Sequence, residues 1–190
     1  PFEVVAVDTI GPLPADVRGN RYVVVMLDAF TRFVELVPAP DASAESAARA
    51  LLSVMGRYGA PRFLRSDNGS QYTARVISSL LELVGSRRQL TVEYRPQSNG
   101  IAERANGEVL RHLRALVADR RVLSTWSDQL PLVQRIVNAT PHAALGTTPA
   151  RVLFGDAVRL DRQLLSEPAD VPRAGQGRGV AVEDYIRRPT

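Results

Sequence analysis

The order of the apolar runs constrains this fold more than any other feature of the sequence. Three short runs rich in valine come first, at Val4 to Val7, Tyr22 to Leu27 and Phe33 to Val37, and turn residues separate them. Such runs predict three consecutive strands, which favour an antiparallel meander. From Ser43 onward the pattern becomes helical and alternates with short extended segments. Strands first and alternating helices later predict an α/β domain with a mixed sheet.

The segments after the meander have recognisable ends. Ser43 is predicted to cap a helix over 44–58, which Gly59 ends. The following pattern predicts a strand over 62–66, a helix over about 73–84, an extended segment over 90–94, and helices over about 101–119 and 125–139.

The carboxyl-terminal part differs in composition from the rest. Beyond about residue 165, large apolar residues become rare and glycine and proline frequent. We therefore predict one domain over 1–160 and a linker or tail over 161–190 that leads to a further module. The start at Pro1, directly before a strand, suggests a piece of a longer polypeptide.

The composition limits the chemistry that this chain can perform. Cysteine is absent, which excludes a thiolate nucleophile, a disulfide framework and a zinc site built on Cys ligands. The two histidines, His112 and His142, lie thirty positions apart, so a His-based site would need both in unusual roles. Any chemistry must therefore depend on carboxylates.

The charge balance suits a phosphate-rich partner. The formal net charge is +4, and every basic residue is arginine, whose planar fork pairs with phosphate. A GC-rich coding bias would account for the arginines equally well. No apolar run reaches the roughly 18 residues needed to span a bilayer, so we expect no membrane partner and an intracellular location.

Three carboxylates occupy positions that can converge in space. Asp8 ends the first predicted strand, Asp67 follows the fourth, and Glu103 begins a predicted helix after a glycine-containing loop. A site for two divalent ions about 3.5–4 Å apart needs acidic oxygens on both ions, and such a site supports in-line attack at a phosphodiester. The chain has 20 acidic residues, and some of them will lie near loops in any fold. Their positions alone therefore leave open that these three are ordinary surface carboxylates.

Two longer segments carry a resemblance to a known family. Ser66 to Tyr72 (SDNGSQY) and Tyr94 to Arg104 (YRPQSNGIAER) resemble the catalytic core of retroviral and Ty3/gypsy retrotransposon integrases, within the DDE superfamily. Residues 68 to 102, thirty-five in all, separate Asp67 from Glu103, which is the D-x35-E spacing of that family. The first strands and the closing segment with Leu153-Phe-Gly155 are also similar, so the resemblance covers roughly residues 3–160.

The resemblance implies a fold, an activity and a set of partners. The fold would be RNase H-like, with a mixed five-stranded sheet flanked by helices. Asp8, Asp67 and Glu103 would be the catalytic residues and the ligands of two Mg²⁺ or Mn²⁺ ions. The activity would be DNA 3′-end processing and strand transfer by a homodimer or homotetramer that binds element ends and target DNA. In a eukaryotic host the protein would be nuclear.

The family's mobile loop implies a set of DNA contacts. The predicted contact residues are Tyr94, Arg95, Gln97, Ser98, Asn99 and Arg104. Two of them could instead be structural, Tyr94 as half-buried core and Asn99 as the cap of the following helix. Arg95 stands where many family members have histidine, which adds a charge next to the DNA loop.

Other candidate residues and functions remain open. Asp28 and His142 are predicted to be structural, and Glu108 to be solvated. A bacterial insertion-sequence transposase would have the same active site. A domesticated copy would bind DNA without catalysis. An RNase H-type nuclease typically needs a fourth carboxylate and is disfavoured.

Overall fold

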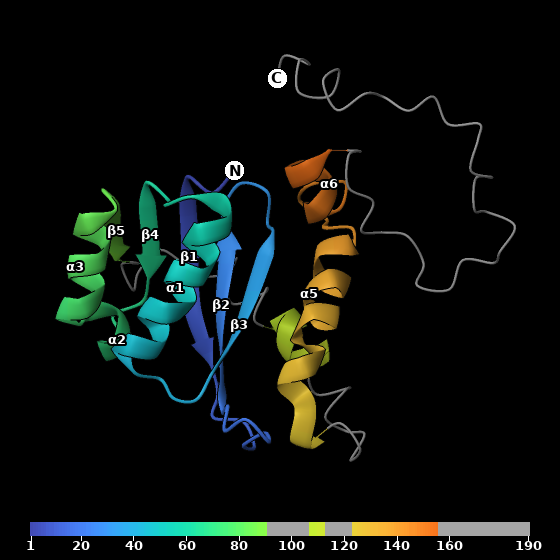
Figure 1. Cartoon of the computed structure of the whole chain (residues 1–190). Helices are drawn as coiled ribbons and strands as arrows, with labels where there is room; N and C mark the ends of the chain where they lie inside the picture. Colours follow the sequence, from blue (N-terminus) through green and yellow to red (C-terminus); the bar gives the residue numbers. More distant parts are fainter. Residues whose placement is uncertain (91–106, 113–122, 156–190) are drawn as a thin grey trace, which may run out of the picture. The chain divides into compact units, whose positions relative to one another are not determined.

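The central sheet is assembled from the strands that the sequence predicts. The computed structural model describes residues 1–90, 107–112 and 123–155 (Figure 1). The strands are β1 (Val4–Ile10), β2 (Tyr22–Asp28), β3 (Val34–Ala39), β4 (Phe63–Ser66) and β5 (Arg87–Leu90). They form one five-stranded sheet in the order β3-β2-β1-β4-β5. The first three are antiparallel, whereas β4 is parallel to both β1 and β5, which confirms the predicted meander and mixed sheet.

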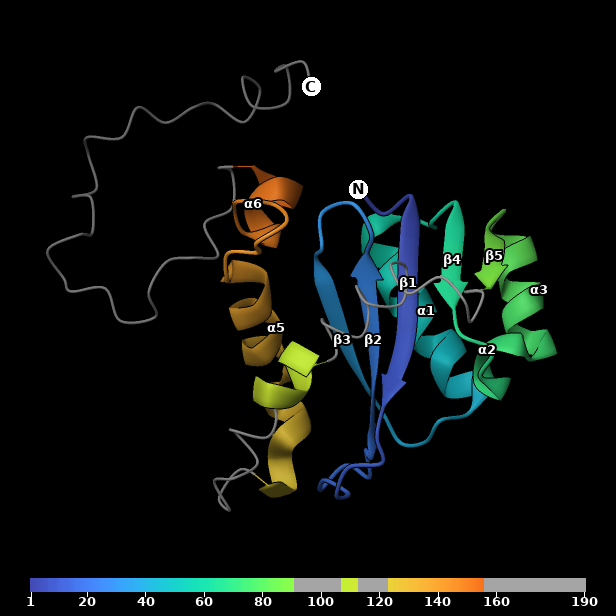
Figure 2. The ribbon, with the colours of Figure 1, turned by 180° about the vertical axis from the view of Figure 1, so that it is seen from behind.

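Helices cover the sheet on both sides. The helical elements are α1 (Ala44–Tyr58), α2 (Ser70–Thr73), α3 (Arg75–Leu83), the 3₁₀ helix η1 (Leu123–Gln129), α5 (Leu130–Ala139) and α6 (Pro149–Phe154), and residues 107–112 are also helical. Seen from behind, α1 and α3 lie beyond the sheet and α5 lies beside β3 (Figure 2). The strand β2 is almost wholly buried because helices pack on both of its faces.

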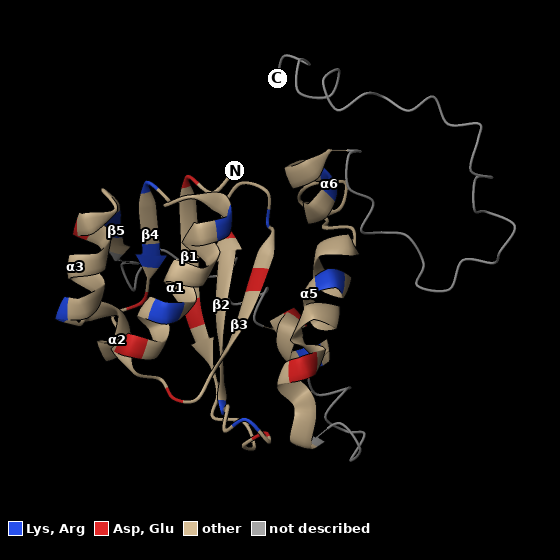
Figure 3. Cartoon of the chain, viewed as in Figure 1, with Lys and Arg blue, Asp and Glu red and all other residues tan. Residues whose placement is uncertain are grey.

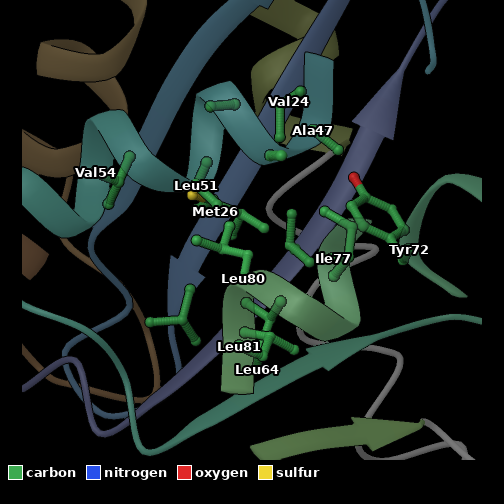
Figure 4. Packing of buried hydrophobic residues seen from close by; sticks show 14 of the residues in the cluster. Val24, Met26, Ala47, Leu51, Val54, Leu64, Tyr72, Ile77, Leu80 and Leu81 are labelled. Carbon is green, nitrogen blue, oxygen red and sulfur yellow. The ribbon is translucent and has the colours of Figure 1, made fainter. Parts of the chain in front are cut away.

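One layer of the core lies between the sheet and α1 and α3. Alternate side chains of the sheet, such as Val5, Met26 and Leu64, meet the apolar stripes of α1 and α3 here (Figure 4). Helix α1 starts where the sequence predicts, since the Ser43 hydroxyl accepts a hydrogen bond from the Ser46 amide at 3.2 Å. This layer fixes how β4 lies beside β1.

The second layer joins the opposite face to η1, α5 and residues 107–112. It contains Val23, Trp126 and Val133, all buried. Helix α5 also binds the outer edge of β3: the Asn138 side chain accepts from Val34 N and donates to Val34 O, both at 2.8 Å, and Gln134 accepts from Leu36 N at 2.9 Å. Three outward backbone groups of the edge strand, Val34 N, Val34 O and Leu36 N, are therefore satisfied by side chains.

Some predicted boundaries were wrong. The helix predicted over about 73–84 corresponds to α3, which begins two residues later and ends one residue earlier, but the short helix α2 before it was not predicted. The helix predicted over 125–139 begins as η1, with non-helical Thr125 inside it. The fifth strand begins at Arg87, three residues before the predicted start. The division into 1–160 and 161–190 stays a prediction.

Within the described residues, we find no helix with the length and apolar character that a membrane span requires.

Candidate active site

Two of the three predicted carboxylates belong to neighbouring parallel strands. Asp67 directly follows β4, as predicted, whereas Asp8 lies within β1, two residues before its end at Ile10, so the prediction that Asp8 ends its strand was wrong. The register of β1 and β4 pairs Val4 with Phe63, Val5 with Leu64 and Ala6 with Arg65. Two steps further along each strand are Asp8 and Asp67, so continuing the register sets them opposite each other. Neighbouring strands are about 4.8 Å apart, which brings both carboxylates to one end of the sheet centre.

The turn after β4 holds the Asp67 carboxylate. Asp67 Oδ1 accepts a hydrogen bond from Gly69 N at 2.9 Å, which is the local pattern of an Asx turn. A Cβ added at Gly69 would lie 2.9 Å from that same Oδ1 and 2.8 Å from the Gln71 side chain. A side chain at this position would therefore displace the Asp67 carboxylate or the Gln71 amide. Asp67 itself is exposed, so it is accessible to a ligand.

On β1, Asp8 is half-buried, and its Oδ1 accepts from the Thr9 amide at 2.7 Å. Its strand neighbours on the same face are Ala6 and Ile10, since side chains alternate along a strand. Both contact the cluster that holds Val109, the fully buried residue of the helical segment 107–112. This segment therefore packs on the sheet face to which Asp8 belongs.

Tyr72 links the two acidic segments, a role that no local pattern in the sequence indicates. The Tyr72 hydroxyl and the Thr9 hydroxyl lie 2.5 Å apart, so α2, which follows Asp67, is bonded to β1 next to Asp8. The ring is fully buried beside Ile77 (Figure 4). Burial raises the pKa of Tyr72, the Thr9 hydrogen bond lowers it, and the nearby charges of Asp8 and Asp67 raise it further. Both carboxylates thus act on one hydroxyl.

The remaining predicted site residues lie outside the described residues. They are Glu103, Tyr94, Arg95, Gln97, Ser98, Asn99 and Arg104. Among residues 1–90, 107–112 and 123–155, no group of three or more His, Asp or Glu side chains could hold a metal ion. The structure therefore brings together Asp8 and Asp67, and the third carboxylate stays a prediction.

Two other polar residues have structural roles, as predicted. Asp28 is fully buried and accepts hydrogen bonds from Phe2 N, Thr31 N and the Thr31 hydroxyl, which close the turn between β2 and β3. His142 accepts from Ala144 N at 3.2 Å through Nδ1, in the turn before α6. Neither residue joins Asp8 and Asp67 as a third metal ligand.

Solved structures with the same arrangement are retroviral integrase cores, so the fold is RNase H-like. The catalytic core domain of BIV integrase superposes with a TM-score of 0.66 at 25% identity, covering 83% of this chain and 97% of that one. A chain of the simian T-cell lymphotropic virus intasome, solved in complex with PP2A regulatory subunit B56 gamma, superposes with a TM-score of 0.71 at 19% identity, covering 91% of this chain and 61% of that one. The HTLV-2 integrase catalytic core domain, solved in complex with magnesium in a trimeric form, superposes with a TM-score of 0.65 at 16% identity. The match covers 80% of this chain and 96% of that one.

The chain belongs to the integrase core domain family, whose model matches residues 1–96. The Pro-Pol polyprotein of simian foamy virus type 3 is 32% identical over 155 residues, which are 82% of this chain. The Gag-Pol polyprotein of feline leukemia virus is 36% identical over 138 residues, or 72% of this chain. The chain spans only 13% and 8%, respectively, of the length of these polyproteins.

Proposed function

We propose that this chain is the catalytic core of a retroviral-type integrase that processes DNA 3′ ends and joins them to a target strand. The observation that carries the proposal is that Asp8 of β1 and Asp67, which follows the neighbouring parallel strand β4, both act on the Tyr72 hydroxyl, in a chain of the integrase core domain family. In the joining step a DNA 3′ oxygen attacks a phosphodiester phosphorus, and the 3′ oxygen of the cut strand leaves. No protein nucleophile is needed.

The oxygen donors present fit a divalent ion. Two carboxylates that act on one hydroxyl, Tyr72, concentrate negative charge at this end of the sheet, and hard cations such as Mg²⁺ prefer carboxylate oxygens. Asp8, Asp67 and Glu103 would hold Mg²⁺ or Mn²⁺, and we propose two ions. When bound, the ions activate the attacking oxygen and stabilise the leaving one.

The chain's own contacts keep the carboxylates in place. The amides of Thr9 and Gly69 each donate to one carboxylate, which fixes its orientation. The Thr9 to Tyr72 bond ties α2, which follows the Asp67 turn, to β1. Glu103 lies four residues before the helical segment 107–112, whose Val109 packs on the Asp8 face, and this connection supports its membership of the site.

The DNA contacts are proposed on the sequence alone. Arg95 and Arg104 would bind phosphates, Gln97, Ser98 and Asn99 would hydrogen-bond DNA near the site, and Tyr94 would stack on an unpaired base. Two DNA ends must meet one target, so we propose a homodimer or homotetramer. The intracellular location, nuclear in a eukaryotic host, is likewise a proposal.

The similarity to the foamy virus and feline leukemia virus polyproteins favours a retroviral-type element over a bacterial insertion sequence, because both relatives are retroviral. The alternative of a domesticated copy, which would bind DNA without catalysis, is separated from an active integrase by an activity assay.

That experiment is a disintegration assay on branched DNA with Mg²⁺ or Mn²⁺. We expect metal-dependent joining by the native chain and its loss in Asp67→Asn and in Glu103→Gln. Glu82→Gln serves as a matched control, since Glu82 is exposed on α3. Metal-dependent joining that persists in both site variants would refute the carboxylate assignment, and inactivity of a folded, DNA-binding native chain would favour the non-catalytic copy.

A further inference from the structure

Two of the arginines of β4 and β5 lie, together with Phe63, on the sheet face opposite the layer under α1 and α3. Leu64 and Ser66 of β4 are buried, and Leu64 belongs to the layer under α1 and α3. Side chains alternate along a strand, so Arg65 points to the opposite face. On β5, Arg88 donates through Nη1 to the carbonyl of Tyr72, at 2.9 Å, which places Arg88 on the α2 side.

Arg87 and Gln89 therefore share the Arg65 face. A hydrogen bond of 3.2 Å from Arg65 Nη2 to Gln89 Oε1 supports this, and the register pairs the two residues directly. We call Arg65, Arg87 and Gln89 the arginine face. Figure 3 shows the basic positions on β4 and β5 in blue.

The charges of the arginine face are not neutralised within the described part of the chain. Arg65 bonds only a neutral amide there, and exposed Arg87 has no ion pair or side-chain hydrogen bond there. The neighbouring Arg62, in contrast, is paired with Glu3 at 3.4 Å and lies 5.3 Å over the Phe63 ring. Two guanidinium groups are thus available to an anionic partner.

The arginine face leads directly to the carboxylate pair. Arg65 is two positions before Asp67, and its register partner Ala6 is two positions before Asp8. Two residues of a strand advance about 6.6 Å, so Arg65 lies roughly that far from the level of the carboxylates. Arg87, paired with Phe63, is one such step further. Duplex DNA carries one charge per about 1.7 Å of axis, so a duplex over this face would present phosphates to both arginines.

We propose that the arginine face binds the phosphate backbone of the DNA that enters the active site. This inference rests on the proposed function, because it assigns a path for the substrate of that site. Arginine forks match phosphate geometry and stay charged at any working pH. The backbone contacts would position DNA without reading its sequence.

The test is DNA binding as a function of salt with a fluorescein-labelled duplex of random sequence. Each phosphate contact contributes about 0.9 to the slope of log K against log salt, so Arg65→Gln/Arg87→Gln should reduce the slope by about two. The matched control is Arg49→Gln/Arg75→Gln, which removes two exposed arginines of α1 and α3 and should leave the slope unchanged.

The outcomes separate this proposal from the proposed function. An unchanged slope in the arginine-face variant, with normal joining activity, would overturn the arginine face alone. An unchanged slope together with self-association of the variant would also overturn the arginine face. It would indicate that these arginines prevent β5 from pairing with another chain. A reduced slope supports the arginine face even if the native chain joins no DNA, in which case only the proposed function fails.

Discussion

At the scale of single residues, the carboxylates depend on neighbours that do no chemistry. Asp67 is held by a backbone amide and Asp8 by another, and a hydroxyl pair ties the two segments together. A substitution that removes one of these hydrogen bonds leaves the carboxylate in the chain but lets its orientation change. We therefore expect such a substitution to lower activity more than stability.

Gly69→Ala tests this dependence. The new methyl would lie 2.9 Å from Asp67 Oδ1, so we expect the carboxylate to shift and joining activity to fall about 10- to 100-fold. Gly56→Ala is the control, because no atom lies within 4 Å of its added Cβ. Equal activities of the two variants, with matched melting temperatures, would show that the turn does not position Asp67.

Tyr72→Phe tests the buried hydroxyl through pH. Burial raises the pKa of Tyr72, so the folded chain keeps its proton after the unfolded chain loses it near pH 10. The free energy of unfolding should therefore fall as the pH rises above 10, by about 1.4 kcal/mol per pH unit from this residue. In Tyr72→Phe that decline should be shallower by this amount. Urea unfolding across alkaline pH would measure it, and parallel curves for the two proteins would contradict the expectation.

At the scale of elements, the loop between β1 and β2 is fastened to η1. Asp16 is buried and accepts hydrogen bonds from Ser127, Asn20 and the Arg18 amide, and Trp126 Nε1 donates to Pro14 O at 2.9 Å. Burial alone would raise the pKa of Asp16, but these hydrogen bonds outweigh it and lower the pKa. The loop thus binds to an element more than a hundred residues away in sequence.

Asp16→Asn should destabilise the chain by about 1–3 kcal/mol, because buried donors lose a charged acceptor. The lowered pKa means that the ionised carboxylate stabilises the fold above pH 4 and that this stabilisation is lost as the pH falls further. Asp128→Asn is the matched control: its pair with Arg18 is solvent-exposed and worth at most about 1 kcal/mol. Equal losses in thermal unfolding at neutral pH would show that Asp16 acts only as a surface charge.

The elements also show how far the sequence could be interpreted. Valine-rich runs determine β2 and β3 locally, and Ser43 determines where α1 begins, so these were predicted correctly. The helix α2 was missed because its four residues are too few to show an apolar period. The resemblance to the integrase family suggested Asp8 and Asp67 as partners, but only strand register brings them together. The Tyr72 to Thr9 contact depends on tertiary packing and has no local signal.

At the scale of the whole molecule, the two edge strands of the sheet, β3 and β5, differ in the side chains that lie along them. The amide side chains of α5 bond the edge of β3, whereas β5 presents arginines. The bonds from α5 keep the edge of β3 from pairing with another chain. The α5 amides also make the late part of the sequence necessary for the stability of an early strand.

Asn138→Leu should expose this dependence. Both outward backbone groups of Val34 would remain buried without partners, which costs about 1–3 kcal/mol for each group. Gln134→Ala, which removes only the partly buried bond to Leu36, should cost about 1 kcal/mol. Urea unfolding would rank the two variants, and an equal or greater loss in Gln134→Ala would contradict the role given to Asn138.

The Asn138 contact has a consequence for synthesis on the ribosome. It joins residues 104 positions apart, so β3 is translated long before the side chain that covers its edge. At about 5–20 residues per second, the nascent strand would wait several seconds or more with an unpaired edge. A chaperone bound to the emerging chain, or slow translation that keeps nascent chains apart, would protect the product most during that interval.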